Sequence, residues 1–185
     1  MTEKQKLQHV HDALKKKFKD KKLIFGKGPI GAKIVFVGDF VDLEAAEESK
    51  PLNARSEKLL NQLLRIAGVN KKHIYVTNVV KYIPPRDRAL TSKEIKSHAT
   101  FLREEVKTIN PDIVVTLGSI ALTGIGLRQP LDNVHGRIFH LGDYSLLPTF
   151  NPELALKDAR VKTLVESDFV KLKELVSLKK EAKTA

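Results

Sequence analysis

Two hydrophobic periods alternate along this chain, one typical of strands and the other typical of helices. Short, nearly continuous apolar runs predict buried strands at 33–38, 73–78, 112–118 and 145–150. Apolar residues that recur every three to four positions predict helices over 3–20, 53–68, about 91–109, 119–125 and about 160–179. Strands that alternate with helices predict an α/β fold. We expect three layers, α/β/α, around a central, mainly parallel four-stranded sheet.

Polar side chains stand where three of the predicted strands end. Asp39 follows the first strand, Asn78 ends the second, and Asn151 follows the fourth. In an open parallel sheet, the ligand crevice lies outside the carboxyl ends of the strands. We therefore expect these three side chains to converge on one pocket.

Composition and charge narrow the function classes. A chain of 185 residues predicts one domain over 1–185, with a lysine-rich tail at about 178–185 after the last helix. The net charge of +11 favours a polyanionic partner, nucleic acid before membrane. A merely soluble lysine-rich surface is the alternative, because six of the lysines lie between Lys15 and Lys22.

Several classes of site have no support in the sequence. The chain has no cysteine, which excludes disulfides, thiol catalysis and thiolate metal sites. Its six histidines form no helical pair with a carboxylate, so a zinc site is not expected. No apolar stretch approaches the ~20 residues that a membrane span needs, and the N-terminus is charged. We expect a cytoplasmic monomer that does not associate with membranes.

An ordered series of motifs extends over about residues 23 to 175. It includes the segment 24–28 before the first strand, the run Thr-Asn-Val-Val-Lys at 77–81 before two prolines, and the run Pro-Thr-Phe-Asn-Pro at 148–152. In this order the motifs resemble the uracil-DNA glycosylase superfamily, and within it the iron–sulfur, thermostable type 4. The resemblance implies an enzyme that flips a nucleotide out of DNA and hydrolyses the bond between base and sugar.

The resemblance also assigns roles to residues around the expected pocket. Asp39 stands where the family has the glutamate of its Gly-Glu-Ala-Pro-Gly motif, and Asn151 stands where the family has a histidine. These two residues are the expected catalytic groups. Asn78, Leu52 and Phe40 are the expected base-binding residues.

A DNA-binding surface is expected beside the pocket, on single- or double-stranded DNA. Its residues would be a positive rim, a phosphate-binding hydroxyl at a helix start, and a side chain that fills the gap left by the flipped nucleotide. The rim is expected to consist of Lys81, Arg86, Arg88 and Arg137. The phosphate-binding hydroxyl is that of Ser119, and the side chain that fills the gap is Leu154.

The departures from the family pattern are informative. Leu52 replaces the aromatic residue that stacks on the base, and stacking is worth about 1–3 kcal/mol per base. The four cluster cysteines are absent: Tyr82 and His98 occupy two of their places, and positions near His11 and Leu14 the others. Without thiolates no iron–sulfur cluster can form by that route, so we expect no cofactor.

Alternatives remain open for the site and for the function. Asp39 is also explained by capping a turn, Asn78 by satisfying a strand end, and Asn151 by an Asn-Pro turn. If these plainer explanations hold, the chain is a glycosylase-like protein without activity that binds DNA or assists a polymerase. We favour an active glycosylase for a modified or bulky pyrimidine, acting in DNA repair or against viruses with modified DNA. Random decay would not leave three polar groups at one crevice.

Overall fold

A mostly parallel sheet forms the centre of the molecule. The computed structural model describes residues 1–185. The sheet consists of the strands β1 (Ile34–Phe40), β2 (Ile74–Val80), β3 (Ile113–Leu117), β4 (Phe139–Leu141) and β5 (Tyr144–Thr149). Their order across the sheet is β2-β1-β3-β5-β4, and only β4 runs antiparallel to its neighbour.

The sheet therefore has five strands and not the predicted four. The additional strand, β4, is three residues long and mostly exposed, so it leaves no buried apolar run in the sequence. A tight turn at Gly142, with φ of 68°, joins it to β5. The α/β class and the mainly parallel arrangement are confirmed.

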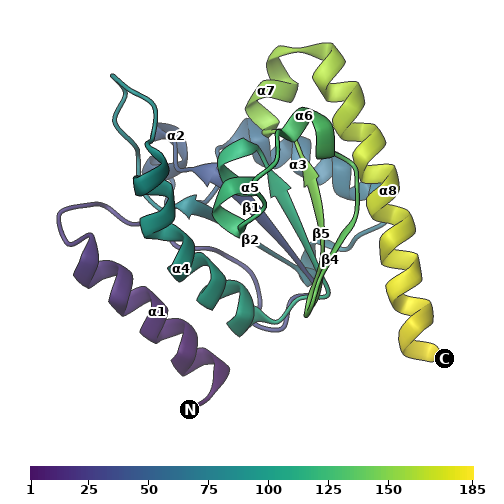
Figure 1. The fold of residues 1–185 in the computed structure, drawn as a ribbon, viewed down its shortest axis with the longest axis horizontal. Coiled ribbons are helices and arrows are strands. Elements are labelled where there is room, and N and C mark those ends of the chain that lie inside the picture. The colour runs from purple at the N-terminus through teal and green to yellow at the C-terminus, as the bar shows by residue number, and fades with distance from the viewer.

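Helices cover both faces of the sheet (Figure 1). One face carries α3 (Ala54–Ala67) and α8 (Ala159–Thr184), and the other carries α4 (Ser92–Ile109) and α5 (Ser119–Ile125). The helix α1 (Glu3–Lys17) packs outside α4. Short helical elements complete the chain: α2 (Leu43–Glu47), η1 (Lys71–His73), α6 (Leu131–Val134) and α7 (Pro152–Lys157).

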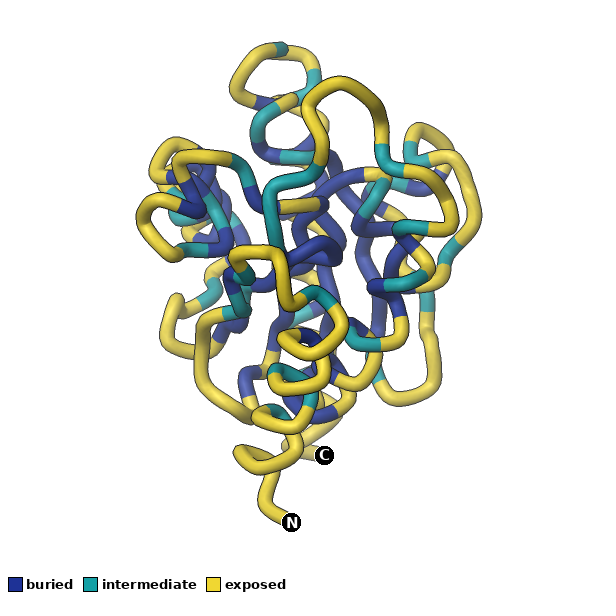
Figure 2. Tube along the Cα trace, turned by 90° about the vertical axis from the view of Figure 1, so that its left-hand side faces the viewer, coloured by how far each residue is buried: buried dark blue, intermediate teal, exposed yellow.

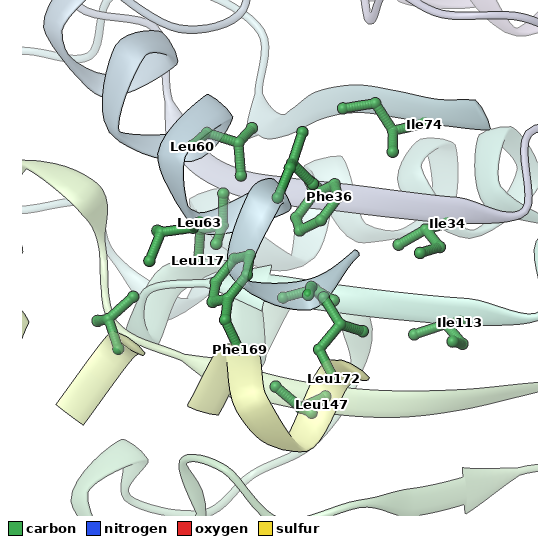
Figure 3. Packing of buried hydrophobic residues seen from close by; sticks show 14 of the residues in the cluster. Ile34, Phe36, Leu60, Leu63, Ile74, Ile113, Leu117, Leu147, Phe169 and Leu172 are labelled. Carbon is green, nitrogen blue, oxygen red and sulfur yellow. The ribbon is translucent and has the colours of Figure 1, made fainter. Parts of the chain in front are cut away.

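Alternation along the strands divides the core into two layers. In β1, Ile34 and Phe36 face α3 and α8, whereas Val35 and Val37 face α4 and α5. Phe36 stacks on Phe169 of α8 with ring centroids 6.1 Å apart. Figure 3 shows both side chains in the core between the sheet and the helices. Burying one large apolar side chain contributes about 1.5–3 kcal/mol, so these two layers supply most of the stabilisation. Figure 2 shows the buried segments in the interior and the exposed ones around it.

Helix boundaries follow local signals where these exist. Thr91 and Glu94 form the capping box that starts α4, and Asn110 in the left-handed conformation ends it before Pro111. The last helix, α8, continues to Thr184 and so includes the lysine-rich segment that we expected beyond it.

Each outer strand of the sheet has one side without a full partner strand. Beside β2, Lys27 forms an isolated antiparallel bridge to Val76, with reciprocal backbone hydrogen bonds of 2.8 Å. Gly28, at φ of 141°, lies so close to β2 that a side chain there would meet the backbone of Ile74 and Tyr75. At the opposite side, the outer strand is the short β4.

No helix in the chain combines the length and the apolar character that crossing a membrane requires.

Candidate active site

The carboxyl ends of the central strands open into a polar cavity of about 270 Å³. Gly38 of β1 is paired with Asn78 of β2 and with Leu117 of β3, so three strand ends lie side by side. The cavity brings together five residues predicted from the sequence: Asp39, Phe40, Leu52, Asn78 and Asn151. Their roles remain proposals, but their convergence is part of the structure.

Asp39 is buried at the bottom of this arrangement, with 8% of its surface exposed. One carboxylate oxygen accepts a hydrogen bond of 2.7 Å from the amide of Ala121 in α5, and the other accepts one of 3.1 Å from Nδ2 of Asn151. Gly118 is required next to it, because any side chain there would collide with this carboxylate. Burial raises the pKa of Asp39, while the hydrogen bonds from Ala121 and Asn151 oppose that rise.

The plainer explanation, that Asp39 caps the turn after the first strand, does not describe its contacts: Asp42 caps the local helix α2, and Asp39 reaches a different helix. Its carboxylate caps a helix, α5, which begins 80 residues later in the chain. The same side chain lines the cavity. Capping and chemistry are compatible, because the cap fixes the position of the carboxylate.

Asn78 is almost fully buried, and its two amide atoms differ in their surroundings. Nδ2 donates a 2.7 Å hydrogen bond to the carbonyl oxygen of Pro51. Oδ1 has no hydrogen-bond partner. The hydrogen-bond network fixes this orientation, because a carbonyl oxygen accepts only from the nitrogen.

Asn151 links the carboxylate to the next helix. Its Oδ1 accepts a 2.8 Å hydrogen bond from the amide of Glu153, which makes it the N-cap of α7 with Pro152 in the first turn. Its Nδ2 is the group that donates to Asp39. The plainer alternative for Asn151 was an Asn-Pro turn; in the structure Asn151 instead caps α7, while its Nδ2 contacts the predicted catalytic group Asp39.

The apolar wall comes from Leu52 and Phe40. Leu52 is half-buried against the core beneath α3, and Phe40 is 39% exposed at the end of β1. No aromatic ring occupies the place of Leu52, so the cavity is wider on this side than an aromatic residue would leave it.

Further polar residues of the cavity were not predicted as site residues. Asn53 donates through Nδ2 to Asp42 and, at 2.6 Å, to Glu153, and the hydroxyl of Ser56 donates to Glu153 at 3.1 Å. In the sequence, Asp42 and Asn53 resemble ordinary helix caps, and they do cap α2 and α3. Lys157 lines the cavity as well.

Lys81 was predicted on the DNA-binding rim, and that prediction is wrong. Its side chain is 1% exposed, and Nζ donates to Glu105 at 2.9 Å, to the hydroxyl of Thr77 at 2.9 Å and to the carbonyl of Asn78 at 2.7 Å. The hydroxyl of Tyr75 also donates to Glu105. A buried ammonium needs such hydrogen-bond partners, and those of Lys81 belong to β2 and α4. Lys81 instead holds the backbone at Asn78.

The other predicted DNA contacts remain on the surface. Arg86, Arg88 and Arg137 are exposed, and Arg88 is paired with Glu94 at 2.6 Å. The loop that carries Arg86 and Arg88 and the helix α7 lie at the same end of the sheet (Figure 1). Leu154 is 45% exposed on α7.

The structure leaves fewer groups for a phosphate contact at Ser119 than the sequence suggested. Its side chain is exposed at the start of α5, but the amide of Ala121 in the same turn already donates to Asp39. A phosphate at this helix start would meet a carboxylate there. Only the hydroxyl of Ser119 and its own amide remain candidates for a phosphate contact.

The residues that replace the cluster cysteines do not fit an iron–sulfur cluster. The hydroxyl of Tyr82 and Nε2 of His98 are 3.1 Å apart, and Phe18 stacks on His98 with ring centroids 4.4 Å apart. Leu14 is buried, and His11 stacks on Phe25 at 4.0 Å. A cluster requires thiolate ligands, whereas these side chains form an aromatic packing between α1 and α4.

This aromatic packing predicts an acid-sensitive stability. Burial, assisted by the charges of Lys81 and Lys17, lowers the pKa of His98 from 6.5 to about 4. At pH values between these two pKa values, the His98 side chain binds a proton in the unfolded chain but not in the folded chain. The free energy of unfolding therefore decreases as pH falls through this window, by on the order of 1–3 kcal/mol, and the decrease ends below it.

Urea unfolding at pH 7 and pH 4.5 measures this effect. The variant His98→Phe is expected to lose the part of the pH dependence that His98 contributes, while His11, whose pKa burial also lowers, keeps its own part. His9→Gln, at an exposed position, is expected to leave the pH dependence unchanged. Equal pH dependence in wild type and His98→Phe would contradict the assignment.

Comparison with known proteins agrees with the site. The model of the uracil DNA glycosylase superfamily matches residues 25–171. The chain therefore belongs to this superfamily, and it is a DNA N-glycosylase, a hydrolase of N-glycosyl bonds.

Individual relatives are similar over most of this chain. A type-4 uracil-DNA glycosylase of Thermotoga maritima is 33% identical over 83% of each chain. One of Saccharolobus solfataricus is 30% identical over 86% of this chain and 78% of its own. A DNA polymerase of Bacillus phage SP01 is 26% identical over 86% of this chain and 17% of its own. The resemblance that the motifs indicated is confirmed.

Proposed function

We propose that this protein flips a modified or bulky pyrimidine out of DNA and hydrolyses its N-glycosidic bond, and that plain uracil is a poorer substrate. One observation carries the proposal: the carboxylate of Asp39 and the amide of Asn78 line a single cavity beside Leu52, where the resemblance expects an aromatic residue. A leucine stacks weakly on a flat base and leaves room for a substituent.

The chemistry assigns a task to each group. As the bond breaks, its electron pair leaves with the base, and positive charge develops on the sugar. The carboxylate of Asp39 stabilises that charge and accepts a proton from the water that adds to the sugar. Because Asp39 is buried and its pKa is raised, its carboxylate is a stronger base than an exposed aspartate.

Binding and recognition come from the surrounding residues. Asn78 holds the polar edge of the flipped base, and Phe40 and Leu52 supply the apolar contact. Arg86, Arg88 and Arg137 contact phosphates, the hydroxyl of Ser119 adds a further phosphate contact, and Leu154 fills the gap left in the duplex. The net charge of +11 supports binding to DNA, with an affinity that falls as salt rises.

The biological role follows from the base that is removed. Removal of a damaged or deaminated base is repair, and removal of a modified base of viral DNA is defence. The changed pocket is the observation that favours the second role.

A second candidate function is a glycosylase-like domain that binds DNA or assists a polymerase without catalysis. The similarity to a segment of a phage DNA polymerase favours this alternative. It predicts binding without base release.

The deciding experiment incubates the protein with DNAs that differ in a single base, and scores alkali-labile strand breaks. The bases are uracil, hypoxanthine, mismatched thymine and pyrimidines with 5-substituents. Release of a substituted pyrimidine faster than uracil supports the proposal. Uracil release at the rate of an ordinary family member contradicts the altered specificity, and absence of any release favours the second candidate.

A further inference from the structure

An open hollow with a basic rim and an aromatic floor lies at the end of α1. Its volume is about 240 Å³, and it is lined by Lys15, Phe18, Lys19, Lys21, Leu23 and Phe25. The three lysines are exposed, and the three apolar side chains are half-buried. None of these residues lines the active-site cavity, so the hollow is separate from the active site.

The lysines of segment 15–22 carry charges that no carboxylate neutralises. None of the ion pairs in the molecule includes one of them. Asp20 is the one carboxylate in this segment, against six lysines. Lys15, Lys16 and Lys17 also offset the negative end of α1, but the other three lie beyond that helix, where this explanation does not apply. Such a density of like charge favours a polyanionic partner.

The aromatic rings of the hollow are fixed from one side. Phe25 stacks on His11 with ring centroids 4.0 Å apart. Phe18 stacks on His98 in the same way, at 4.4 Å. Nζ of Lys15 lies 5.7 Å from the centre of the Phe25 ring, so a cation and a ring border the same space. Grooves that bind single-stranded nucleic acid combine these two features, because cations contact the phosphates and rings stack on the bases.

The hollow adjoins the surface proposed to contact DNA. Nζ of Lys21 lies 5.4 Å from the centre of the Tyr82 ring, and the chain continues from Tyr82 into the exposed loop that carries Arg86. The backbone amide of Ile24 donates a 2.7 Å hydrogen bond to the carbonyl of Lys81. Figure 1 shows the segment after α1 and this loop at the same side of the molecule.

The acidic helix α2 limits the path of a bound strand. Lys22 donates a 2.8 Å hydrogen bond to the carbonyl of Ala46, so α2 also borders the basic segment. Glu44 and Glu47 are exposed on α2, and their charges repel phosphates. A strand that leaves the hollow toward the active site therefore passes along the loop after Tyr82.

We infer that this hollow binds a single-stranded segment of DNA. The lysines contact its phosphates, and the rings of Phe18 and Phe25 stack on its bases. The inference goes beyond the proposed function, because it concerns a surface outside the cavity and requires neither a flipped nor a modified base.

The test measures the binding of a short fluorescent oligothymidylate, and of a mixed-sequence duplex of the same length, over a range of salt concentrations. The triple variant Lys15→Gln, Lys19→Gln, Lys21→Gln is expected to lose at least about tenfold in affinity for the single strand. The slope of log affinity against log salt is expected to become shallower by about two, because three phosphate contacts are removed.

A second triple variant is the matched control. Lys162→Gln, Lys173→Gln, Lys180→Gln removes the same charge from exposed positions of α8. This helix covers the face of the sheet opposite to the one on which α4 and α1 pack. The control is expected to change neither the affinity nor the salt slope by a comparable amount.

Loss of a ring separates stacking from charge. Phe25→Leu keeps an apolar side chain and is expected to weaken single-strand binding about fivefold or more, which is the effect of one stacked base. Duplex binding is expected to stay the same, because the bases of a duplex are already stacked. Phe18→Leu repeats the test on the second ring, so the result does not depend on the folding of one variant.

The outcomes separate the inference from the proposed function. Equal losses in the two triple variants indicate an effect of net charge alone and overturn the inference. Single-strand binding that survives the loss of either ring also overturns it. Both outcomes leave the proposed function in place, because no DNA in this test contains uracil or a modified base. Absence of base release from any DNA overturns the proposed function and leaves the inference in place.

Discussion

Replacing Asp39 with alanine or asparagine is expected to lower base release by roughly 10²–10⁴-fold, the range that a general base contributes. DNA binding is expected to persist, because the arginines proposed to contact phosphate lie elsewhere on the surface. Catalysis needs the ionised carboxylate, so release by the wild type is expected to decline as pH falls through the raised pKa of Asp39. Single-turnover release of a substituted pyrimidine measures both effects.

The cap that Asp39 provides for α5 requires a stability control. Asp39→Asn keeps an oxygen for the amide of Ala121, whereas Asp39→Ala removes it. Thr91→Ala removes a different helix cap, at α4, at a cost of about 0.5–2 kcal/mol, and reports what lost stability alone does to the assay. If Asp39→Asn releases base at the wild-type rate, the catalytic role is wrong.

Replacing Lys81 with methionine is expected to destabilise the fold by about 3–5 kcal/mol. Glu105 is fully buried, and its carboxylate then keeps only the hydroxyls of Tyr75 and Thr77. The lost charge leaves an uncompensated anion in the core, which is costly. Urea unfolding at pH 7 measures the change in the free energy of unfolding.

An exposed ion pair provides the matched control. Lys71 and Glu57 are 3.2 Å apart on the surface, and Lys71→Met is expected to change stability by less than about 1 kcal/mol. The double variant Lys81→Met with Glu105→Leu is expected to recover much of the loss, because no unpaired charge remains. A single-variant effect no larger than that of Lys71→Met would contradict the burial of the pair.

The sequence predicted the cavity because strand ends are local signals. Asp39 and Asn78 follow buried apolar runs, and parallel pairing brings such ends together irrespective of distance in the chain. The sequence did not predict that Asn53 joins Asp42 to Glu153, because a contact across 100 residues leaves no local pattern. A helix-capping residue on the surface and one that lines a cavity give the same sequence signal, so the sequence does not distinguish them.

The burial of Lys81 had a readable signal that the prediction missed. Glu105 lies on the apolar stripe of α4, between Leu102 and Val106, where a charged residue needs a partner. The prediction placed Lys81 with the basic loop that follows it because only its neighbours in sequence were considered. A carboxylate on the apolar face of a predicted helix indicates that some lysine or arginine is buried with it.

The Lys27 bridge beside β2 has a consequence for self-association. Outer strands expose unpaired amides and carbonyls, which can template the addition of a strand from another copy. At β2 the bridge occupies part of these groups and places a lysine there, and at the other side β4 is only three residues long. Both are known protections against edge-to-edge aggregation. Both borders of the sheet are therefore poor templates for strand addition by a second copy of this chain.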